Sequence, residues 1–170
     1  MKYLKHILSA IERLDYVRYE YATMLAVLLE DGGAASPRDL ARLFRSFGTP
    51  LSPEARKALG LHPNALLTEE ALAALTELGR QDPIHAIETT LEAAAWSFAR
   101  ESVVEAGVRI GGGKFCIAGK FGECRGCRRL NGQVVTKDFL AAIPPIDCTR
   151  EACALGLKPY TEPERRLVEG

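Results

Sequence analysis

The sequence predicts a mainly α-helical protein whose helical body, two long and about three short helices, is followed by a small, cysteine-rich β-hairpin module. Apolar residues recur every three or four positions through most of residues 1–107, which is the period of an amphipathic helix. Asn131 and Gly132 follow each other in a short alternating stretch, a pattern typical of a hairpin. All 5 cysteines lie in the last third of the chain. We therefore expect a helical domain over 1–110, a Cys-rich hairpin module over 111–157 and a C-terminal tail over 158–170.

The two long helices are expected at the two ends of the helical domain. Residues 4–28 carry one continuous apolar stripe, and the glycines after Asp31 are suited to end a helix. The second long helix begins at Pro83 and ends at Gly107 or at the glycine run over 111–113. An antiparallel pairing of the two helices would bury both stripes. Any part of the first stripe left uncovered predicts a contact with another subunit, and therefore an oligomer.

The three short helices begin with the same local signal. Ser36, Ser52 and Thr68 are residues that cap helix N-termini, because their side-chain oxygen accepts a hydrogen bond from a free backbone N–H of the first turn. Proline follows the two serines at the first helical position, where it is favoured. We interpret the equal spacing of the three signals as repeated helix starts rather than a solenoid repeat. The expected short helices cover 37–47, 53–59 and 69–79.

The pattern changes to short strands after residue 113. Residues 114–117 alternate between polar and apolar, and Asn131-Gly132 predicts the tight turn of a hairpin. The Pro144-Pro145 pair excludes a helix at that point. We expect a last short helix over 149–157, capped by Thr149, and a polar tail that runs over the surface.

The cysteines define the candidate functional site. Cys124 and Cys127 form a C-x2-C pair, and Cys148 and Cys153 form a C-x4-C pair further on. Two such pairs on either side of a hairpin are typical of a structural four-thiolate zinc site, as in zinc ribbons. Cys116 is a spare thiol that could replace Cys153 as the fourth ligand. The sequence therefore predicts zinc as the cofactor.

Other states of these cysteines stay open. Disulfides are the main alternative, because intracellular disulfides do occur in thermophiles. Reduced, unligated thiols and an iron–sulfur cluster are the others, although cluster ligands are usually spaced more tightly. His6, His62 and His85 lie far from the cysteines in sequence and are not expected to bind the metal.

The charge of the chain is unevenly distributed. Lys and Arg number 22, and so do Asp and Glu, so no global field attracts nucleic acid or an anionic membrane. Residues 108–138 nevertheless carry 7 basic and 2 acidic side chains. This segment predicts either phosphate binding or neutralisation of a metal–thiolate cluster, with Phe115 and Phe121 as candidates for base stacking. The candidate nucleic-acid-binding residues are Lys114, Lys120, Arg125, Arg128 and Arg129.

Several classes of protein are disfavoured. The composition, with 47% hydrophobic and 26% charged residues, argues against a mostly disordered chain. We expect neither a membrane span nor a signal peptide, because charges interrupt every apolar stretch, and we expect the protein not to be secreted. No catalytic triad is apparent, and the glycine run before Lys114 lacks the first glycine and the Ser or Thr of a phosphate-binding loop. We therefore predict no catalytic residues and no enzymatic activity.

One longer motif surrounds the cysteines. The chain reads Cys124-Arg-Gly-Cys127-Arg-Arg-Leu-Asn-Gly-Gln-Val-Val, and later Ile143-Pro-Pro-Ile-Asp-Cys148. Over about 108–157 this resembles the C-terminal part of tailed-phage minor head (head-morphogenesis) proteins. There a long helix precedes a C-x2-C hairpin that leads to a Pro-Pro segment and further cysteines. The chain differs from that family in having Ile146-Asp147 where a His-Pro pair is usual.

Two functions of different classes follow. The resemblance implies a structural or assembly protein of a phage-like particle, in the virion or the cytoplasm, with the cysteine module as a metal-stapled docking element. It also implies contact with the portal or the capsid interior and with DNA. The residues alone equally suit a zinc-binding adaptor or regulator that contacts nucleic acid through the basic segment. Both hypotheses require protein partners, self-association or nucleic acid, and neither requires a membrane.

Overall fold

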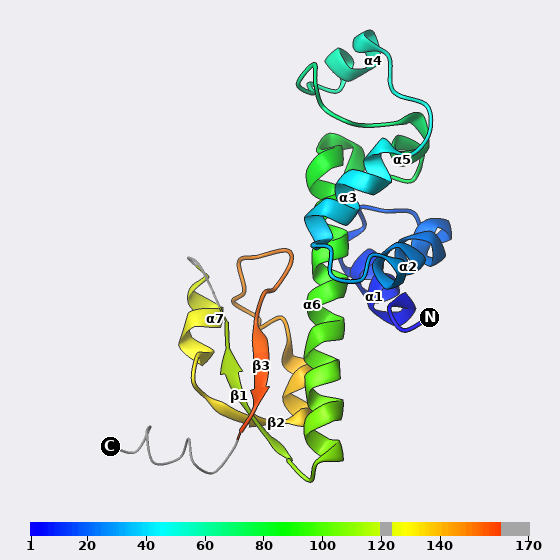
Figure 1. The fold of residues 1–170 in the computed structure, drawn as a ribbon. Helices are drawn as coiled ribbons and strands as arrows, with labels where there is room; N and C mark the ends of the chain where they lie inside the picture. The colour runs from blue at the N-terminus through cyan, green and yellow to red at the C-terminus, as the bar shows by residue number, and fades with distance from the viewer. Residues whose placement is uncertain (120–123, 161–170) are drawn as a thin grey trace. The chain divides into compact units, whose positions relative to one another are not determined.

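The computed structural model describes residues 1–119 and 124–160, and it has the predicted mainly helical fold followed by a small sheet (Figure 1). The chain divides into two compact units, an N-terminal unit of residues 1–95 and a C-terminal unit of residues 96–170, which we describe separately. Their boundary lies inside the long helix α6, Pro83–Arg109, rather than at residue 110. The reason is that the last turns of α6 supply Val103 and Val104 to the core of the C-terminal unit.

The N-terminal unit is built from helices whose starts agree with the sequence signals. Ser36, Ser52 and Thr68 each accept a hydrogen bond from a first-turn amide, as expected for N-caps. The helices are α1 Leu4–Leu14, α2 Ala22–Asp31, α3 Pro37–Ser46, α4 Pro53–Ala58, α5 Glu69–Ala73 and the first part of α6, with 3-10 turns at Tyr19–Tyr21 and Gly79–Gln81. The buried side chains of Ile7, Leu25, Leu75, Ile87 and Leu91 form its core.

The single long helix predicted over 4–28 is wrong, because the chain forms two helices there, α1 and α2, that pack against each other. Asp15 adopts a left-handed conformation, with φ of 51°, and ends α1. Val17 is then buried in an antiparallel bridge with Leu75. The apolar period of the sequence continues through this break, because α1 and α2 each bury one face in the core. The pairing of a 4–28 helix with α6, and the subunit contact inferred from its length, lose their basis.

The same bridge shortens the helix predicted over 69–79. The Arg18 amide donates to the Ala74 carbonyl at 2.8 Å, and the Thr76 amide donates to the Tyr16 carbonyl at 3.1 Å. These bonds and the bridge at Leu75 take the chain out of the helix after Ala74, so α5 ends at Ala73. Among the residues that the structure describes, only α6 is therefore a long helix.

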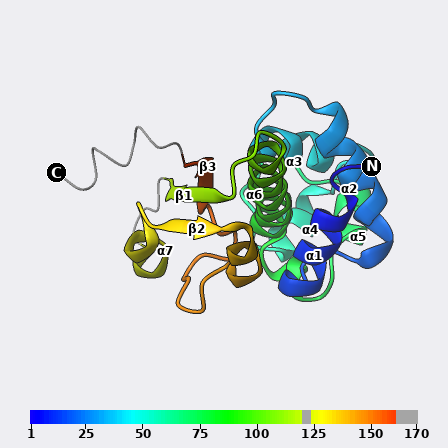
Figure 2. The same cartoon turned by 90° about the horizontal axis from the view of Figure 1, so that it is seen from below.

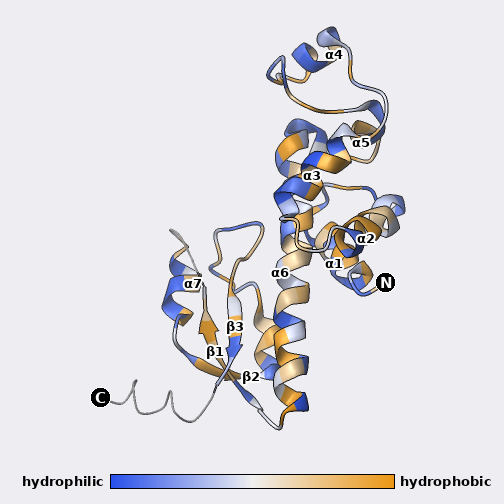
Figure 3. Cartoon of the chain, in the orientation of Figure 1, coloured by the Kyte–Doolittle hydropathy of each residue, from blue (hydrophilic) through white to orange (hydrophobic). Residues whose placement is uncertain are grey.

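The C-terminal unit contains a three-stranded antiparallel sheet in the order β2-β1-β3, with α7 next to it (Figure 2). Its elements are β1 Lys114–Ala118, α7 Arg125–Leu130, β2 Val134–Thr136, a 3-10 helix Lys137–Ala142 and β3 Gly156–Pro159. In register, Phe115 lies opposite Val135, and Ile117 lies opposite Leu157. β1 is apolar along most of its length, whereas α7 is hydrophilic (Figure 3).

Two further predictions in this unit need correction. Asn131 and Gly132 do not form the turn of a hairpin, because they end α7, and the Gly132 amide donates to the Ile117 carbonyl at 2.8 Å. The sheet is antiparallel as expected, but β1 and β2 are joined through α7 in the sequence rather than by a tight turn. The helix predicted over 149–157 is also wrong, since the chain there extends into β3 and buries Leu155 and Leu157. Residues 158 and 159 belong to β3, and residues 161–170 of the predicted tail lie outside the described residues.

Within the described residues, none of the helices combines the length and the apolar character that a membrane span requires.

The close pairing of residues 16–18 and 74–76 predicts that Gly79 tolerates no side chain. A Cβ atom there would overlap the Tyr16 carbonyl oxygen, which the backbone holds in place. We expect Gly79→Ala to destabilise the protein by about 1–3 kcal/mol, the usual cost of overpacking. Gly113→Ala is the matched control, because its Cβ would meet nothing within 4 Å. Urea unfolding followed by circular dichroism measures the stability of both variants. Equal unfolding midpoints for the two variants would contradict the close approach of Gly79 to Tyr16.

Candidate metal centre

Helix α7 positions the first cysteine pair. Cys124 is extended and stands directly before the helix, whereas Cys127 lies in its first turn. Residues three apart at a helix start lie on one face, so the two thiols lie on the same side. The first amides of a helix have no partner within it. One of them, the Cys127 N–H, donates to the Cys124 sulfur, as the C-x2-C spacing predicts.

Long-range contacts fix the second pair. Cys148 follows the 3-10 helix, and Cys153 comes shortly before β3. The buried Arg100 of α6 donates through Nη1 to the carbonyl oxygens of Cys153, at 2.9 Å, and Leu155, at 3.0 Å. Arg129 of α7 forms an ion pair with Asp147 at 2.9 Å. The backbone next to each second-pair cysteine is therefore tied to a helix.

Gly126 allows the segment before Cys148 to approach α7 closely. A Cβ atom at this position would lie 2.5 Å from Oδ1 and 2.8 Å from the carbonyl oxygen of Asp147. Any larger residue would move Asp147, and with it the adjacent Cys148. The glycine in the C-R-G-C motif is thus explained by close packing against a distant segment as well as by the local turn.

The thiols of Cys124, Cys127 and Cys148 lie within 4.8 Å of one another, and Cys153 contacts Cys127. The Sγ–Sγ distances are 3.6 Å for Cys127 to Cys148, 3.7 Å for Cys127 to Cys153 and 3.8 Å for Cys124 to Cys148. A tetrahedral site with metal–sulfur bonds of 2.3 Å has sulfur–sulfur edges of about 3.8 Å. A disulfide requires about 2.05 Å, and all five cysteines are free. The arrangement fits metal ligation and has no disulfide geometry.

The cluster lies in a largely apolar surrounding. Cys124, Cys127 and Cys153 are buried together with Phe115 and Leu155, and Cys148 is half-buried. A buried thiol is stable when neutral, but four adjacent thiolates would repel one another strongly in such surroundings. A bound cation would remove that repulsion, so the site can hold four thiolates only with a metal ion.

The protein shifts the pKa values of these thiols in opposite directions. Hydrogen bonds from the Cys127 amide, and then from Thr149, lower the pKa of Cys124 from 9.0 to about 6 against the effect of burial. Burial raises the pKa of Cys127 well above its ordinary value and also raises that of Cys148. At neutral pH the metal-free cluster therefore combines one thiolate with neighbouring protonated thiols.

Cys116 does not join the cluster. Side chains alternate across β1, and Phe115 and Ile117 face the core that contains the cysteines. Cys116 lies on the opposite face, where its thiol donates a hydrogen bond to the Ile117 carbonyl at 3.7 Å. The three histidines belong to the N-terminal unit, and none of them is part of the thiol cluster.

The basic candidates separate into different environments. Arg125, Arg128 and Arg129 are exposed on α7, beside the cluster, and Lys114 is exposed on β1. Phe115 is fully buried and cannot stack on a base, which corrects that prediction. Lys120 and Phe121 lie outside the described residues.

Sequence reasoning missed Arg100 and Asp147. Arg100 interrupts the apolar period of α6, and a charged residue within a predicted buried stripe is the signal that it has a specific contact. Asp147 carried no comparable signal, because its contact with α7 depends on how the chain folds back.

Comparisons with protein-family models, curated proteins and solved structures find no match to this chain.

The thiol pKa values predict that metal affinity increases steeply with pH. Cys127 and Cys148 must lose protons when a metal binds, because burial keeps them protonated at neutral pH. With at least two protons released, the affinity should rise about a hundredfold per pH unit. Cys124 adds little to this slope above its pKa of about 6. Titration with Co²⁺ between pH 6.5 and 8, read from the thiolate absorption bands, gives the slope, and a flat profile would contradict the assigned protonation states.

Proposed function

We propose that Cys124, Cys127, Cys148 and Cys153 bind one zinc ion as a structural, four-thiolate site. The observation that carries this proposal is the closeness of the thiols: those of Cys124, Cys127 and Cys148 lie within 4.8 Å of one another, and Cys153 contacts Cys127 at 3.7 Å. Four protein ligands leave no coordination position for water or substrate. The proposed site is therefore non-catalytic, and the protein is proposed to act without enzymatic chemistry.

The proposed zinc ion would join segments that are distant in the sequence. It would join the start of α7, the Cys148 segment and the chain entering β3, within a unit whose buried core is small. Small domains commonly need a metal or disulfide to supplement such a core. Because the four thiols become a site only when the chain is folded, the free energy of metal binding contributes to folding.

We propose that this stapled module is the docking element of a structural or assembly protein of a phage-like particle. The support is the C-R-G-C motif with its later Pro-Pro and cysteine segment, together with a long helix, α6, directly before the module. The partner would be another protein of the particle. Portal and terminase genes beside this one would support the proposal, and its isolation in an operon of regulators would oppose it.

The second candidate is a zinc-binding adaptor that contacts nucleic acid. The observation in its favour is that Arg125 and Arg128 are both exposed on α7, next to the thiols. Arginines presented by one short helix can contact successive phosphates. The competing explanation for the same charge is neutralisation of the zinc tetrathiolate, which carries about −2.

The zinc proposal predicts different outcomes for two cysteine variants. Protein purified anaerobically should contain about one zinc per chain, and Cys127→Ser should lose it, because Cys127 approaches two of the other three sulfurs. Cys116→Ser is the matched control and should retain zinc, since Cys116 lies on the other face of β1. Elemental analysis measures both variants.

Hydrogen exchange in Cys127→Ser should rise over residues 114–157 and stay unchanged in α1 to α5, which lie in the other unit. Folded wild-type protein without metal, with all thiols reduced, would disprove the proposed site.

The nucleic-acid candidate predicts a salt-dependent effect of the α7 arginines. Replacing Arg125 and Arg128 with Ala should weaken binding to a 30-base-pair duplex equally for all sequences. It should also reduce the slope of log K against log salt by about 2, because each arginine that is removed loses one phosphate contact. Arg129 is kept, because it pairs with Asp147. Arg42→Ala/Arg80→Ala is the charge-matched control on the other unit. Unchanged binding and slope in the α7 variant would leave metal neutralisation as the role of this charge.

A further inference from the structure

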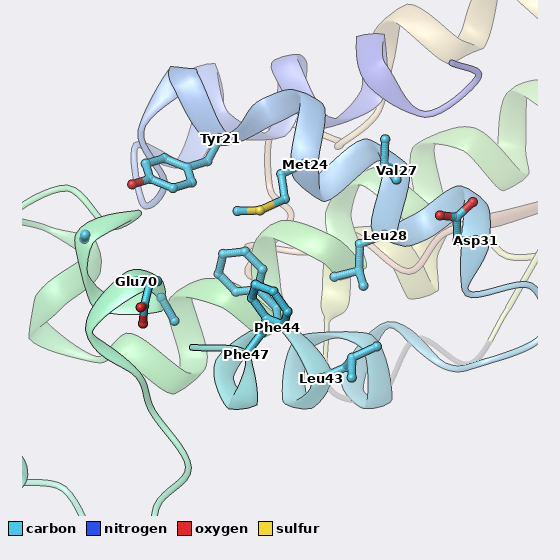
Figure 4. Close-up of a pocket in the computed structure, with 11 residues that line it drawn as sticks. Tyr21, Met24, Val27, Leu28, Asp31, Leu43, Phe44, Phe47 and Glu70 are labelled. Carbon is cyan, nitrogen blue, oxygen red and sulfur yellow. The ribbon is translucent and has the colours of Figure 1, made fainter. Parts of the chain in front are cut away.

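The N-terminal unit has an apolar groove that the proposed zinc site does not involve. The groove has a volume of about 660 Å³ and runs between α2 and α3, with α5 at one end (Figure 4). Leu43 of α3 and Phe47, which directly follows this helix, line it and are 56% and 75% exposed. Met24 and Val27 of α2 also line it and are 43% and 41% exposed. Such a continuous apolar surface typically marks an interaction site.

The sequence of α2 indicates that the groove is normally covered. Leu25, Ala26 and Leu29 bury one face of this helix in the core, and Met24 and Val27 make the outer face apolar as well. A helix that is apolar on all sides is expected to be buried on all sides. Within this unit only one face of α2 is buried, so the other face lacks the cover that its composition calls for.

The charges in the groove indicate what kind of partner covers it. Asp31 and Glu70 lie at its two ends, and no basic residue is among the lining residues that the structure describes (Figure 4). Thr49 fixes the Glu70 carboxylate by donating from its amide at 2.8 Å and from its hydroxyl at 3.3 Å. A hydrogen bond from its own backbone amide, and then those from Thr49, lower the pKa of Glu70, so it stays ionised.

Asp31 occupies an electrostatically poor position unless a cation approaches it. It is the last residue of α2, where the helix dipole disfavours negative charge. It forms no ion pair with any residue in the described part of the chain. A basic side chain docked at this end of the groove would offset both effects.

We propose that this groove binds an amphipathic helix of a partner protein, with apolar side chains at positions i, i+3, i+4 and i+7 and Lys or Arg at its ends. Helix-in-groove recognition uses anchors of this spacing. The apolar floor fits the anchors, and the two terminal carboxylates fit the basic ends. A second copy of this chain is a poorer occupant, because a two-fold contact would bring the acidic ends of two grooves together.

The test is a selection, from a displayed library of 18-residue helical peptides, of those that bind the full-length protein. The library fixes apolar residues at i, i+3, i+4 and i+7 and randomises the remaining positions. Selected binders should be enriched in Lys and Arg at the ends, and Leu43→Gln should weaken them about tenfold, the effect of losing a central apolar contact. Asp31→Asn should weaken them less and reduce the preference for basic ends.

Arg42→Gln is the matched control, since Arg42 is exposed beside Leu43 and does not line the groove. Melting temperatures establish that the variants fold. If Leu43→Gln does not fold, Val27→Gln on α2 takes its place. Binders without basic enrichment, or binders insensitive to the groove variants, would overturn the proposal. Concentration-dependent dimers that Leu43→Gln dissociates would identify a second copy as the occupant and would overturn it as well. The zinc content is unaffected by any of these outcomes.

Discussion

The C-terminal unit depends on four thiols that lie side by side in its interior. Three of the eight buried residues that form its described core are cysteines, and Cys148 packs against them. Sulfur atoms at 3.6–3.8 Å are in contact without being bonded, so they gain little stability by themselves. The unit therefore has a core in which a cation can replace much of the hydrophobic surface that larger domains bury.

The surrounding residues restrict the cluster to one arrangement. Gly126 lets the Asp147 backbone come close to α7, and Arg129 holds Asp147 there through its ion pair. Arg100 binds two carbonyl oxygens around Cys153, and its burial makes those hydrogen bonds obligatory. None of these residues carries a ligand atom of the proposed site. Their effect is to fix the backbone on both sides of the thiols, which is the preorganisation that a tetrahedral site needs.

The N-terminal unit follows a different principle, since backbone pairing rather than side-chain chemistry determines its shape. The bridge between Val17 and Leu75 interrupts two stretches that are helical by periodicity, and Gly79 is small enough to fit against Tyr16. One consequence is that α2 becomes a separate helix beside α3, and the groove between them is formed.

The sequence alone determined the features that depend on neighbouring residues. The caps at Ser36, Ser52 and Thr68, the long helix from Pro83, the strand over 114–117 and the amide-to-sulfur contact of the C-x2-C pair each arise within one or two turns of chain. The spacing also pointed to the cysteines of the cluster, of which Cys124, Cys127 and Cys148 lie within 4.8 Å of one another and Cys153 contacts Cys127. Only the tertiary structure decided that Cys116 stays apart, that Asn131-Gly132 ends a helix and that residues 156–159 form a strand. Apolar periodicity reports that a face is buried, but it does not report what buries it. The bridge at Val17 and the approach of Asp147 to Gly126 join residues 58 and 21 positions apart, and no local pattern encodes such contacts.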